Sequence, residues 1–225
     1  MEKKPSISQY LISTCLFIID ELNDKYSNVE KKELKAIADQ KYNEMDITVR
    51  IGYPFRQMAH YTVGDKDEMG YAKSNHDIFI ESKDYKIEVK YLKNWKSSNK
   101  SRSSSNSALW KTYQNDFDWL FNEIDNGNKN NRAFVIGWFN CVDYFAQMIQ
   151  LGETSGSKPL ANERRICYFP YLYKANHPTY TSDLLIDYSS AYECLSVRPI
   201  GTKTGEYNCI FIGKPSDVFH FAIYY

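Results

Sequence analysis

Residues 75–90 of this 225-residue chain read NHDIFIESKDYKIEVK, a stretch typical of a β-hairpin. Its two halves, near residues 76–81 and 86–92, alternate apolar and polar side chains as half-buried strands do. A short polar segment between them suits a tight turn. The stretch therefore predicts two antiparallel strands, around which the neighbouring elements must be arranged.

Three charged side chains of this hairpin are expected to converge. Alternation places Glu88 and Lys90 on one face of the second strand, and Asp77 at the head of the first strand falls opposite Glu88 if the turn covers residues 82–85. The other face of the second strand carries the apolar side chains Ile87, Val89 and Tyr91. Burial of that face would leave two carboxylates and one ammonium group together on the opposite side.

Two neighbouring carboxylates repel each other and are costly to bury, and a divalent cation relieves both effects. Mg²⁺ prefers hard oxygen ligands and is commonly held by one or two carboxylates together with phosphate oxygens of a substrate. A lysine beside it can orient a water molecule or stabilise developing negative charge. These residue types suit the hydrolysis of a phosphodiester. The competing interpretation is a solvated strand face with a cross-strand ion pair.

Asp77, ten further residues and then Glu88-Val89-Lys90 resemble the D-x(n)-E-x-K signature of the PD-(D/E)XK nuclease superfamily. The order of predicted elements over residues 30–140 also resembles its restriction-endonuclease-like core. The resemblance implies a nuclease that acts mostly on DNA and depends on Mg²⁺, for which Mn²⁺ can substitute. It assigns Asp77, Glu88 and the Val89 carbonyl to the metal, and catalysis to Asp77, Glu88 and Lys90.

The chain departs from that signature at His76, where the family's name has proline. Many members also carry a glutamate on the first core helix, and three residues qualify here, namely Glu30, Glu33 and Glu44. A glutamine on the helix after the hairpin is a further family feature, for which Gln114 is the match.

The rest of the first two thirds reads as helices and strands around the hairpin. Ser6-x-x-Gln9 predicts a capping box, and helical spacing follows it at Ile7, Leu11, Cys15, Ile18 and Leu22. A second helix is expected over residues 30–45, with Leu34, Ile37, Ala38 and Met45 on one face, and a strand over residues 47–53. Helical spacing recurs at Trp110, Tyr113, Phe117, Leu120, Phe121 and Ile124. Residues 133–139 form a continuous apolar run typical of a central strand, and a helix is expected over residues 142–151.

The last third is richer in strand patterns, at residues 165–169, 193–197, 207–212 and 219–224. We therefore predict an α/β (α+β) fold: a mixed sheet flanked by helices over residues 1–152, and a β-rich extension over residues 153–225. The extension is either a separate unit or part of the same sheet.

Positive charge is concentrated just after the candidate metal site. Between Lys83 and Lys111 there are eight basic and two acidic residues, whereas 28 basic and 28 acidic residues cancel over the whole chain. These residues either solubilise a loop or, as we favour from their position, contact the nucleic-acid backbone without reading bases. The candidates for nucleic-acid binding are Lys93, Lys96, Lys100, Arg102, Lys111 and Gln114. The nearby Trp95 and Trp110 either stack on bases or, as we favour, anchor the loop to the core.

Five cysteines without metal-ligand spacing, Cys15, Cys141, Cys167, Cys194 and Cys209, favour reduced thiols and a cytoplasmic protein. The run at residues 10–19 continues into acidic residues and favours a buried helix over a signal peptide or a membrane span. The hairpin residues, the local basic charge and the resemblance to PD-(D/E)XK nucleases together imply a DNA endonuclease of a restriction or phage and mobile-DNA defence system. Two alternatives stay open: a nuclease-like binding or immunity-type protein without turnover, and a nuclease toxin that cleaves RNA. A two-fold dimer is the simplest state for a double-strand cutter, because one site serves one strand.

Overall fold

The computed structural model of the protein describes residues 5–55, 76–93, 106–141, 145–153, 159–174, 180–200 and 207–225. Within these residues six strands form one mixed sheet in the order β1-β2-β3-β8-β7-β6. The strands are β1 (Ile78–Ile80), β2 (Tyr85–Leu92), β3 (Arg132–Phe139), β6 (Cys194–Val197), β7 (Tyr207–Ile212) and β8 (Phe219–Tyr224). β2 and β3 are parallel, and the other neighbouring pairs are antiparallel. The predicted α/β class with a mixed sheet is confirmed.

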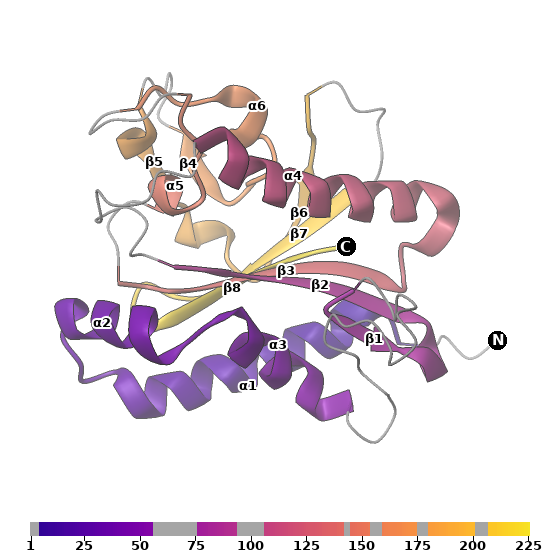
Figure 1. The fold of residues 1–225 in the computed structure, drawn as a ribbon, viewed down its shortest axis with the longest axis horizontal. Helices are drawn as coiled ribbons and strands as arrows, with labels where there is room; N and C mark the ends of the chain where they lie inside the picture. The colour runs from indigo at the N-terminus through magenta and orange to yellow at the C-terminus, as the bar shows by residue number, and fades with distance from the viewer. Residues whose placement is uncertain are drawn as a thin grey trace.

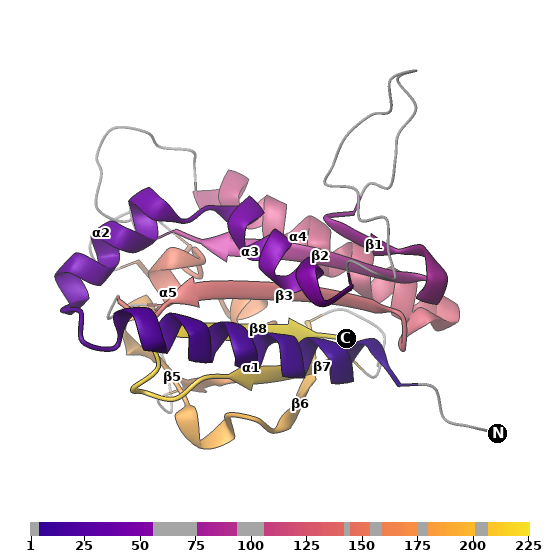
Figure 2. The ribbon, with the colours of Figure 1, turned by 90° about the horizontal axis from the view of Figure 1, so that it is seen from below.

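Helices cover both faces of this sheet (Figure 1). One face carries α1 (Ile7–Tyr26), α2 (Lys31–Lys41) and α3 (Glu44–Gly52), followed by the 3₁₀ turn η1 (Tyr53–Phe55). The other face carries α4 (Asn106–Glu123), α5 (Phe145–Met148) and α6 (Glu163–Ile166), together with the small sheet of β4 (Leu172–Lys174) and β5 (Leu184–Ile186). Figure 2 shows α1 running along the sheet, where it contacts β8 and β3. The sheet is therefore buried from two sides.

Two apolar clusters, one on each face, hold these layers together. The predicted helical stripe of α1 is buried in the first, at Ile7, Leu11, Cys15, Ile18 and Leu22. The predicted stripe of α4 is buried in the second, at Trp110, Tyr113, Phe117 and Leu120, and continues into a π-helical turn, η4 (Ile124–Asn128). Every residue of β3 is buried, as expected of a central strand. The periodic apolar patterns thus identified the main core elements correctly.

The predicted helix over residues 30–45 is present as the shorter α2, with Leu34, Ile37 and Ala38 buried, but the predicted strand over residues 47–53 is wrong. The chain forms two helices, α2 and α3, and Met45 is 47% exposed on α3. Asn43 caps α3: its side chain accepts a hydrogen bond from the Asp46 N–H at 3.1 Å, and the Asp46 carboxylate accepts one from the Asn43 N–H at 2.8 Å. Ile47 and Ile51, four residues apart, are then buried on one helical face. The capping box outweighs the β propensity of the branched residues.

Residues 165–169 are not a strand either. They belong to α6 and the turn after it, where the Arg165 N–H donates to the Asn162 carbonyl. The helix predicted over residues 142–151 appears as the shorter α5, and residues 142–144 lie outside the described residues. The strands predicted at residues 193–197, 207–212 and 219–224 are present as β6, β7 and β8. β8 pairs with β3, so the sheet combines strands from both sides of the predicted boundary near residue 152.

The five cysteines form no disulfide with one another, and Cys15, Cys141 and Cys209 are buried. In the part of the chain that the structure describes, no helix is long and apolar enough to cross a membrane.

His220 on β8 is a fully buried histidine whose neutral form the fold favours. Its Nε2 lies 3.0 Å from the Lys214 carbonyl oxygen, and a Cβ on Gly213 would come within 2.2 Å of its ring. Burial lowers the pKa of His220 to about 4, against the opposing effects of the Lys214 carbonyl and Asp217.

The lowered pKa of His220 predicts a pH-dependent stability. Below pH 6.5 His220 binds a proton in the unfolded chain, whereas in the folded chain it does so only below about pH 4. The free energy of unfolding therefore falls as the pH falls through this window. Between pH 7 and pH 5 we expect a loss of about 2 kcal/mol from this group. Urea unfolding at the two pH values should show it, and His220→Gln should remove that part of the difference. An unchanged pH dependence in the variant would contradict the assignment.

Candidate functional site

The β1–β2 hairpin places Asp77 opposite Glu88. Ile78 pairs with Ile87, and Ile80 pairs with Tyr85, so the same register continued by one residue brings Asp77 to Glu88. The turn between the strands is a 3₁₀ segment, η2 (Glu81–Lys83), closed by Asp84 at a φ of +52°. Aspartate tolerates this left-handed conformation better than most side chains do.

The alternation of β2 separates its polar face from its apolar face. Ile87, Val89 and Tyr91 are buried in the cluster that α1 and α3 cover. The Glu88 and Lys90 side chains lie on the opposite face, toward α4, and are only 12% and 20% exposed. These two charged groups are therefore held in a partly desolvated position.

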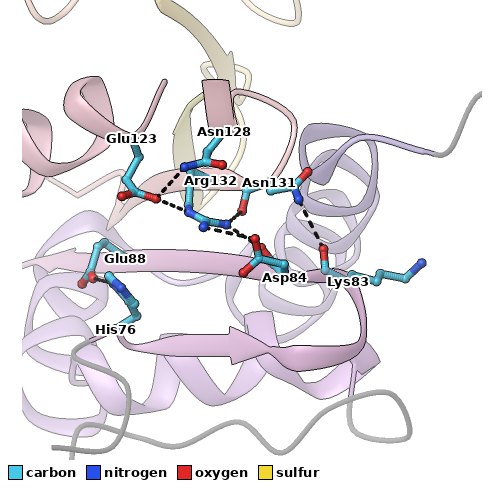
Figure 3. Close-up of polar contacts among 8 residues, drawn as sticks. All are labelled: His76, Lys83, Asp84, Glu88, Glu123, Asn128, Asn131 and Arg132. Carbon is cyan, nitrogen blue, oxygen red and sulfur yellow. Dashed lines mark hydrogen bonds and ion pairs between the residues drawn. The ribbon is translucent and has the colours of Figure 1, made fainter. Parts of the chain in front are cut away.

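Asp77 and Glu88 each make a close polar contact within the hairpin region. The Asp77 Oδ2 accepts a hydrogen bond from the Val89 N–H at 2.7 Å, which ties the start of the hairpin to β2. The Glu88 Oε1 lies 2.6 Å from the Nδ1 of His76 (Figure 3). Burial raises the pKa of Glu88, His76 lowers it and the nearby Asp77 raises it further. Asp77 thus lies close enough to Glu88 to disfavour the ionisation of Glu88.

Lys90 lies between carboxylates from two helices. Its Nζ is 3.5 Å from the Glu44 Oε1 at the start of α3 and 3.5 Å from the Asp116 Oδ2 on α4, and it also contacts the Val89 carbonyl at 3.4 Å. Burial alone would lower the pKa of Lys90, but the surrounding carboxylates, Glu44 first and then Asp116, raise it above its usual value. The ammonium form of Lys90 is therefore stabilised.

Asp116 is the most strongly perturbed carboxylate of this group. Burial raises its pKa to about 7 although Lys90 lowers it, and Glu88 and Asp77 add to the rise. Its Oδ2 is buried and makes no hydrogen bond to the described residues, and the 3.5 Å approach of Lys90 is an ion pair too long for a strong hydrogen bond. Lys90 and Asp116 thus differ: the ammonium keeps its charge, whereas the carboxylate takes up a proton near neutral pH.

We call Glu44, Asp77, Glu88, Lys90 and Asp116 the acidic cluster. If all five groups are ionised it carries four negative charges and one positive charge. Such an excess of carboxylates in a partly buried position is unfavourable without a further cation, and is more typical of functional sites than of structural ion pairs.

Three candidate glutamates were open for the first core helix, and the structure brings one of them to the cluster. Besides its contact with Lys90, Glu44 accepts a hydrogen bond from the Tyr91 N–H at 3.4 Å. Glu30 precedes α2 as its N-cap residue, and Glu33 is exposed in the first turn of that helix. Spacing in the sequence could not choose Glu44 over the other two, because one predicted helix over residues 30–45 contained all three.

Gln114 does not join the cluster. Its amide contacts Tyr168 at 2.7 Å, Asp118 at 2.8 Å and the Trp110 indole at 3.1 Å. Asp116, two residues further along α4, occupies the face that meets Lys90. The sequence signal that could have identified it is the helical spacing of Asp116, Trp119 and Glu123, whose side chains contact Lys90, His76 and Arg132 respectively.

Three of the six candidates for nucleic-acid binding are among the described residues, namely Lys93, Lys111 and Gln114. Lys96, Lys100, Arg102 and Trp95 lie outside the described residues. Lys93 follows β2 and is half-buried, and Lys111 is exposed on α4. Trp110 is 8% exposed and packs against Tyr168 and Phe169, which agrees with the anchoring role that we favoured.

A cavity of about 380 Å³ lies on the other layer, between α1 and α3. Its lining is mainly apolar and includes Phe17, Val49 and Tyr53, while its charged members, Glu21 and Arg50, form an ion pair with each other. A cavity is the usual first candidate for a site. We prefer the acidic cluster, because its perturbed, closely spaced titratable groups suit bond-breaking chemistry better.

Comparisons with known proteins identify no family. No protein-family model matches the chain, and no match was found among curated proteins or among solved structures. Among the residues that the structure describes, no group of three or more His, Cys, Asp or Glu side chains is arranged to hold a metal ion. The resemblance to PD-(D/E)XK nucleases therefore continues to depend on the motif residues themselves.

Proposed function

We propose that this protein is a Mg²⁺-dependent deoxyribonuclease with a restriction-endonuclease-like core. The observation that carries the proposal is the approach of Asp77, Glu88 and Lys90 on the polar face of one hairpin, with Glu44 and Asp116 added from two helices. Further support comes from the order of elements, in which helices precede the hairpin and α4 connects β2 to the parallel β3.

The donor set of the hairpin fits a divalent cation that keeps water and substrate oxygens among its ligands. Asp77 and Glu88 would hold it, with the Val89 carbonyl assisting. These are hard oxygen donors. A cation bound between them would also offset the effect of Asp77, which raises the pKa of Glu88. Mg²⁺ seldom requires a complete cage of protein ligands, so two carboxylates are sufficient. When bound, Mg²⁺ or Mn²⁺ polarises a phosphoryl oxygen and lowers the pKa of a bound water.

Lys90 is proposed to act on the reacting phosphate. Hydrolysis forms a bond between the water oxygen and phosphorus and breaks one ester P–O bond; the water loses a proton and the leaving oxygen gains one. The Lys90 ammonium stabilises the negative charge that develops on the phosphoryl oxygens. Glu44 and Asp116 hold this ammonium from two sides, so its position is set before substrate binds.

One observation favours a second candidate function, that of a nuclease-like binding or immunity-type protein without turnover. The Glu88 carboxylate lies 2.6 Å from His76, and the Lys90 ammonium pairs with Glu44 and Asp116. Charged groups of the proposed site are therefore already paired within the protein. For cleavage, Glu88 must exchange His76 for the cation. We prefer the nuclease because these ion pairs leave a surplus of carboxylates, which a site for protein binding does not need.

The decisive experiment incubates the purified chain with plasmid DNA, single-stranded DNA and transfer RNA, each with Mg²⁺, with Mn²⁺ and with EDTA. We expect DNA cleavage with either metal and none with EDTA. Cleavage that survives chelation would overturn the proposed mechanism, and cleavage of transfer RNA alone would identify an RNA-cleaving toxin. Absence of cleavage under every condition would favour the binding protein. A restriction or defence role predicts activity on foreign DNA, and a two-fold dimer would allow both strands to be cut.

A further inference from the structure

Lys86 lies on the same strand face as Glu88 and Lys90. The strand β2 alternates buried and half-buried residues, and Lys86 is half-buried on the polar side. Two residues along a strand span about 6.6 Å. Because phosphates on one DNA strand advance about 3.4 Å each along the helix axis, Lys86 lies one or two nucleotide steps from the proposed site of cleavage.

The Lys86 ammonium is not engaged with a carboxylate among the described residues. The ring of Phe79, its partner across the hairpin, lies 6.0 Å from its Nζ, which keeps the side chain over β1. The neighbouring cation on β3, Arg132, is by contrast 4% exposed and paired with Glu123 and Asp84. The Lys86 side chain is therefore open to an anionic ligand, whereas Arg132 is occupied by Glu123 and Asp84.

The charge of the acidic cluster explains why such a lysine is needed. With all four carboxylates ionised the cluster carries a net charge of −3, which repels a polyanion, and a single divalent cation offsets only two of these three charges. A cationic side chain directly beside the cluster supplies attraction at the point where the DNA backbone must enter. Lys86 is one of the eight basic residues counted between Lys83 and Lys111, but it is not among the candidates for nucleic-acid binding named from the sequence.

We propose that Lys86 binds a backbone phosphate of the DNA next to the one that is cleaved. The inference rests on the proposed function, since it concerns the substrate of that site. Contact with the backbone should strengthen binding independently of base sequence and should be weakened by salt.

The test is a salt titration of DNA binding for Lys86→Gln and the wild-type protein. Fluorescence anisotropy of a labelled duplex would be measured in Ca²⁺, a hard cation that takes similar oxygen ligands. We expect affinity to fall about three- to tenfold and the slope of log K against log salt to become shallower by about 0.9, or about 0.7 with single-stranded DNA. Lys86→Arg, which keeps the charge, should restore the slope.

Lys83→Gln is the matched control. Lys83 belongs to the same hairpin and is also half-buried, but its ammonium lies over the rings of Tyr10 and Tyr85, on the other side of the sheet. Its loss should leave the slope unchanged. Equal slopes for Lys86→Gln and wild type, or equal losses in both variants, would overturn the inference.

The two proposals can fail separately. A wild-type protein that binds DNA through Lys86 but cleaves nothing in Mg²⁺ would refute the nuclease and leave the phosphate contact standing. If the protein cleaves DNA but the slope of log K against log salt is the same for Lys86→Gln and wild type, only the phosphate contact is refuted. A protein that neither binds nor cleaves DNA would refute both.

Discussion

Lys90→Met and Glu88→Gln are each expected to reduce DNA cleavage by about 10²- to 10⁴-fold, the range typical of a group that acts on a transition state. The Lys90 change removes the ammonium held between Glu44 and Asp116, and the Glu88 change removes a proposed metal ligand. Both substitutions keep the approximate shape of the side chain. Rates of plasmid nicking in Mg²⁺ would measure the loss, and circular dichroism would show that the fold is retained.

Glu81→Gln provides the control for this pair of variants. Glu81 is an exposed carboxylate in η2 of the same hairpin, and its loss should leave cleavage unchanged. Lys90→Arg should recover little activity, because a planar guanidinium does not reproduce a compact ammonium between two carboxylates. Cleavage at near wild-type rates by Lys90→Met would show that the acidic cluster is not the active site.

Arg132→Met is expected to lower the free energy of unfolding by about 3–5 kcal/mol, as when one partner of a buried ion pair is removed. Its side chain is only 5% exposed, and its Nε lies 2.5 Å from the Glu123 Oε2 while its Nη2 lies 3.2 Å from the Asp84 Oδ2 (Figure 3). It also donates to the carbonyls of Asp84 and Asn131. Methionine would leave Glu123 without its cation. Urea unfolding at pH 7 measures the change.

Two further variants test the physical reason for this loss. Lys111→Met removes an exposed charge from α4 and should alter the free energy of unfolding by no more than about 0.5 kcal/mol. Arg132→Met combined with Glu123→Leu should recover part of the stability, because replacing both members of a buried pair avoids an uncompensated charge. A loss below about 1 kcal/mol in Arg132→Met would contradict the buried-pair explanation.

Arg132 also connects stability to the candidate site. It joins Asp84 in the hairpin turn to Glu123 at the end of α4, the helix that supplies Asp116 to Lys90. The hairpin and α4 are thereby held in a common position. We expect the Arg132 variant to lose cleavage partly through disorder of the acidic cluster, at temperatures below its unfolding transition.

Elements with a strong local pattern could be predicted from the sequence. The capping box and apolar spacing of α1, the apolar stripe of α4 and the continuous apolar run of β3 all correspond to observed elements. The hairpin also appears where alternation placed it. In each case the signal is carried by residues that are neighbours in the chain, so no knowledge of distant partners is required.

The prediction failed where two local signals compete. Residues 47–53 alternate β-branched side chains, yet the Asn43 and Asp46 capping box and the burial of Ile47 and Ile51 produce a helix. Spacing also could not identify Glu44 as the glutamate that approaches Lys90, because one predicted helix contained all three candidates. Propensity in a short segment is weak compared with tertiary packing.

The sequence by itself determined the α/β class, the hairpin and the face on which Glu88 and Lys90 stand, because alternation along a strand is a local property. Only the tertiary structure decided that Glu44 and Asp116, 46 residues before and 26 residues after Lys90, complete the acidic cluster. It also decided that β8 lies beside β3 in a single sheet. These contacts join segments far apart in the chain. They are selected by the packing of α3, α4 and β8 on the sheet, which no local pattern encodes.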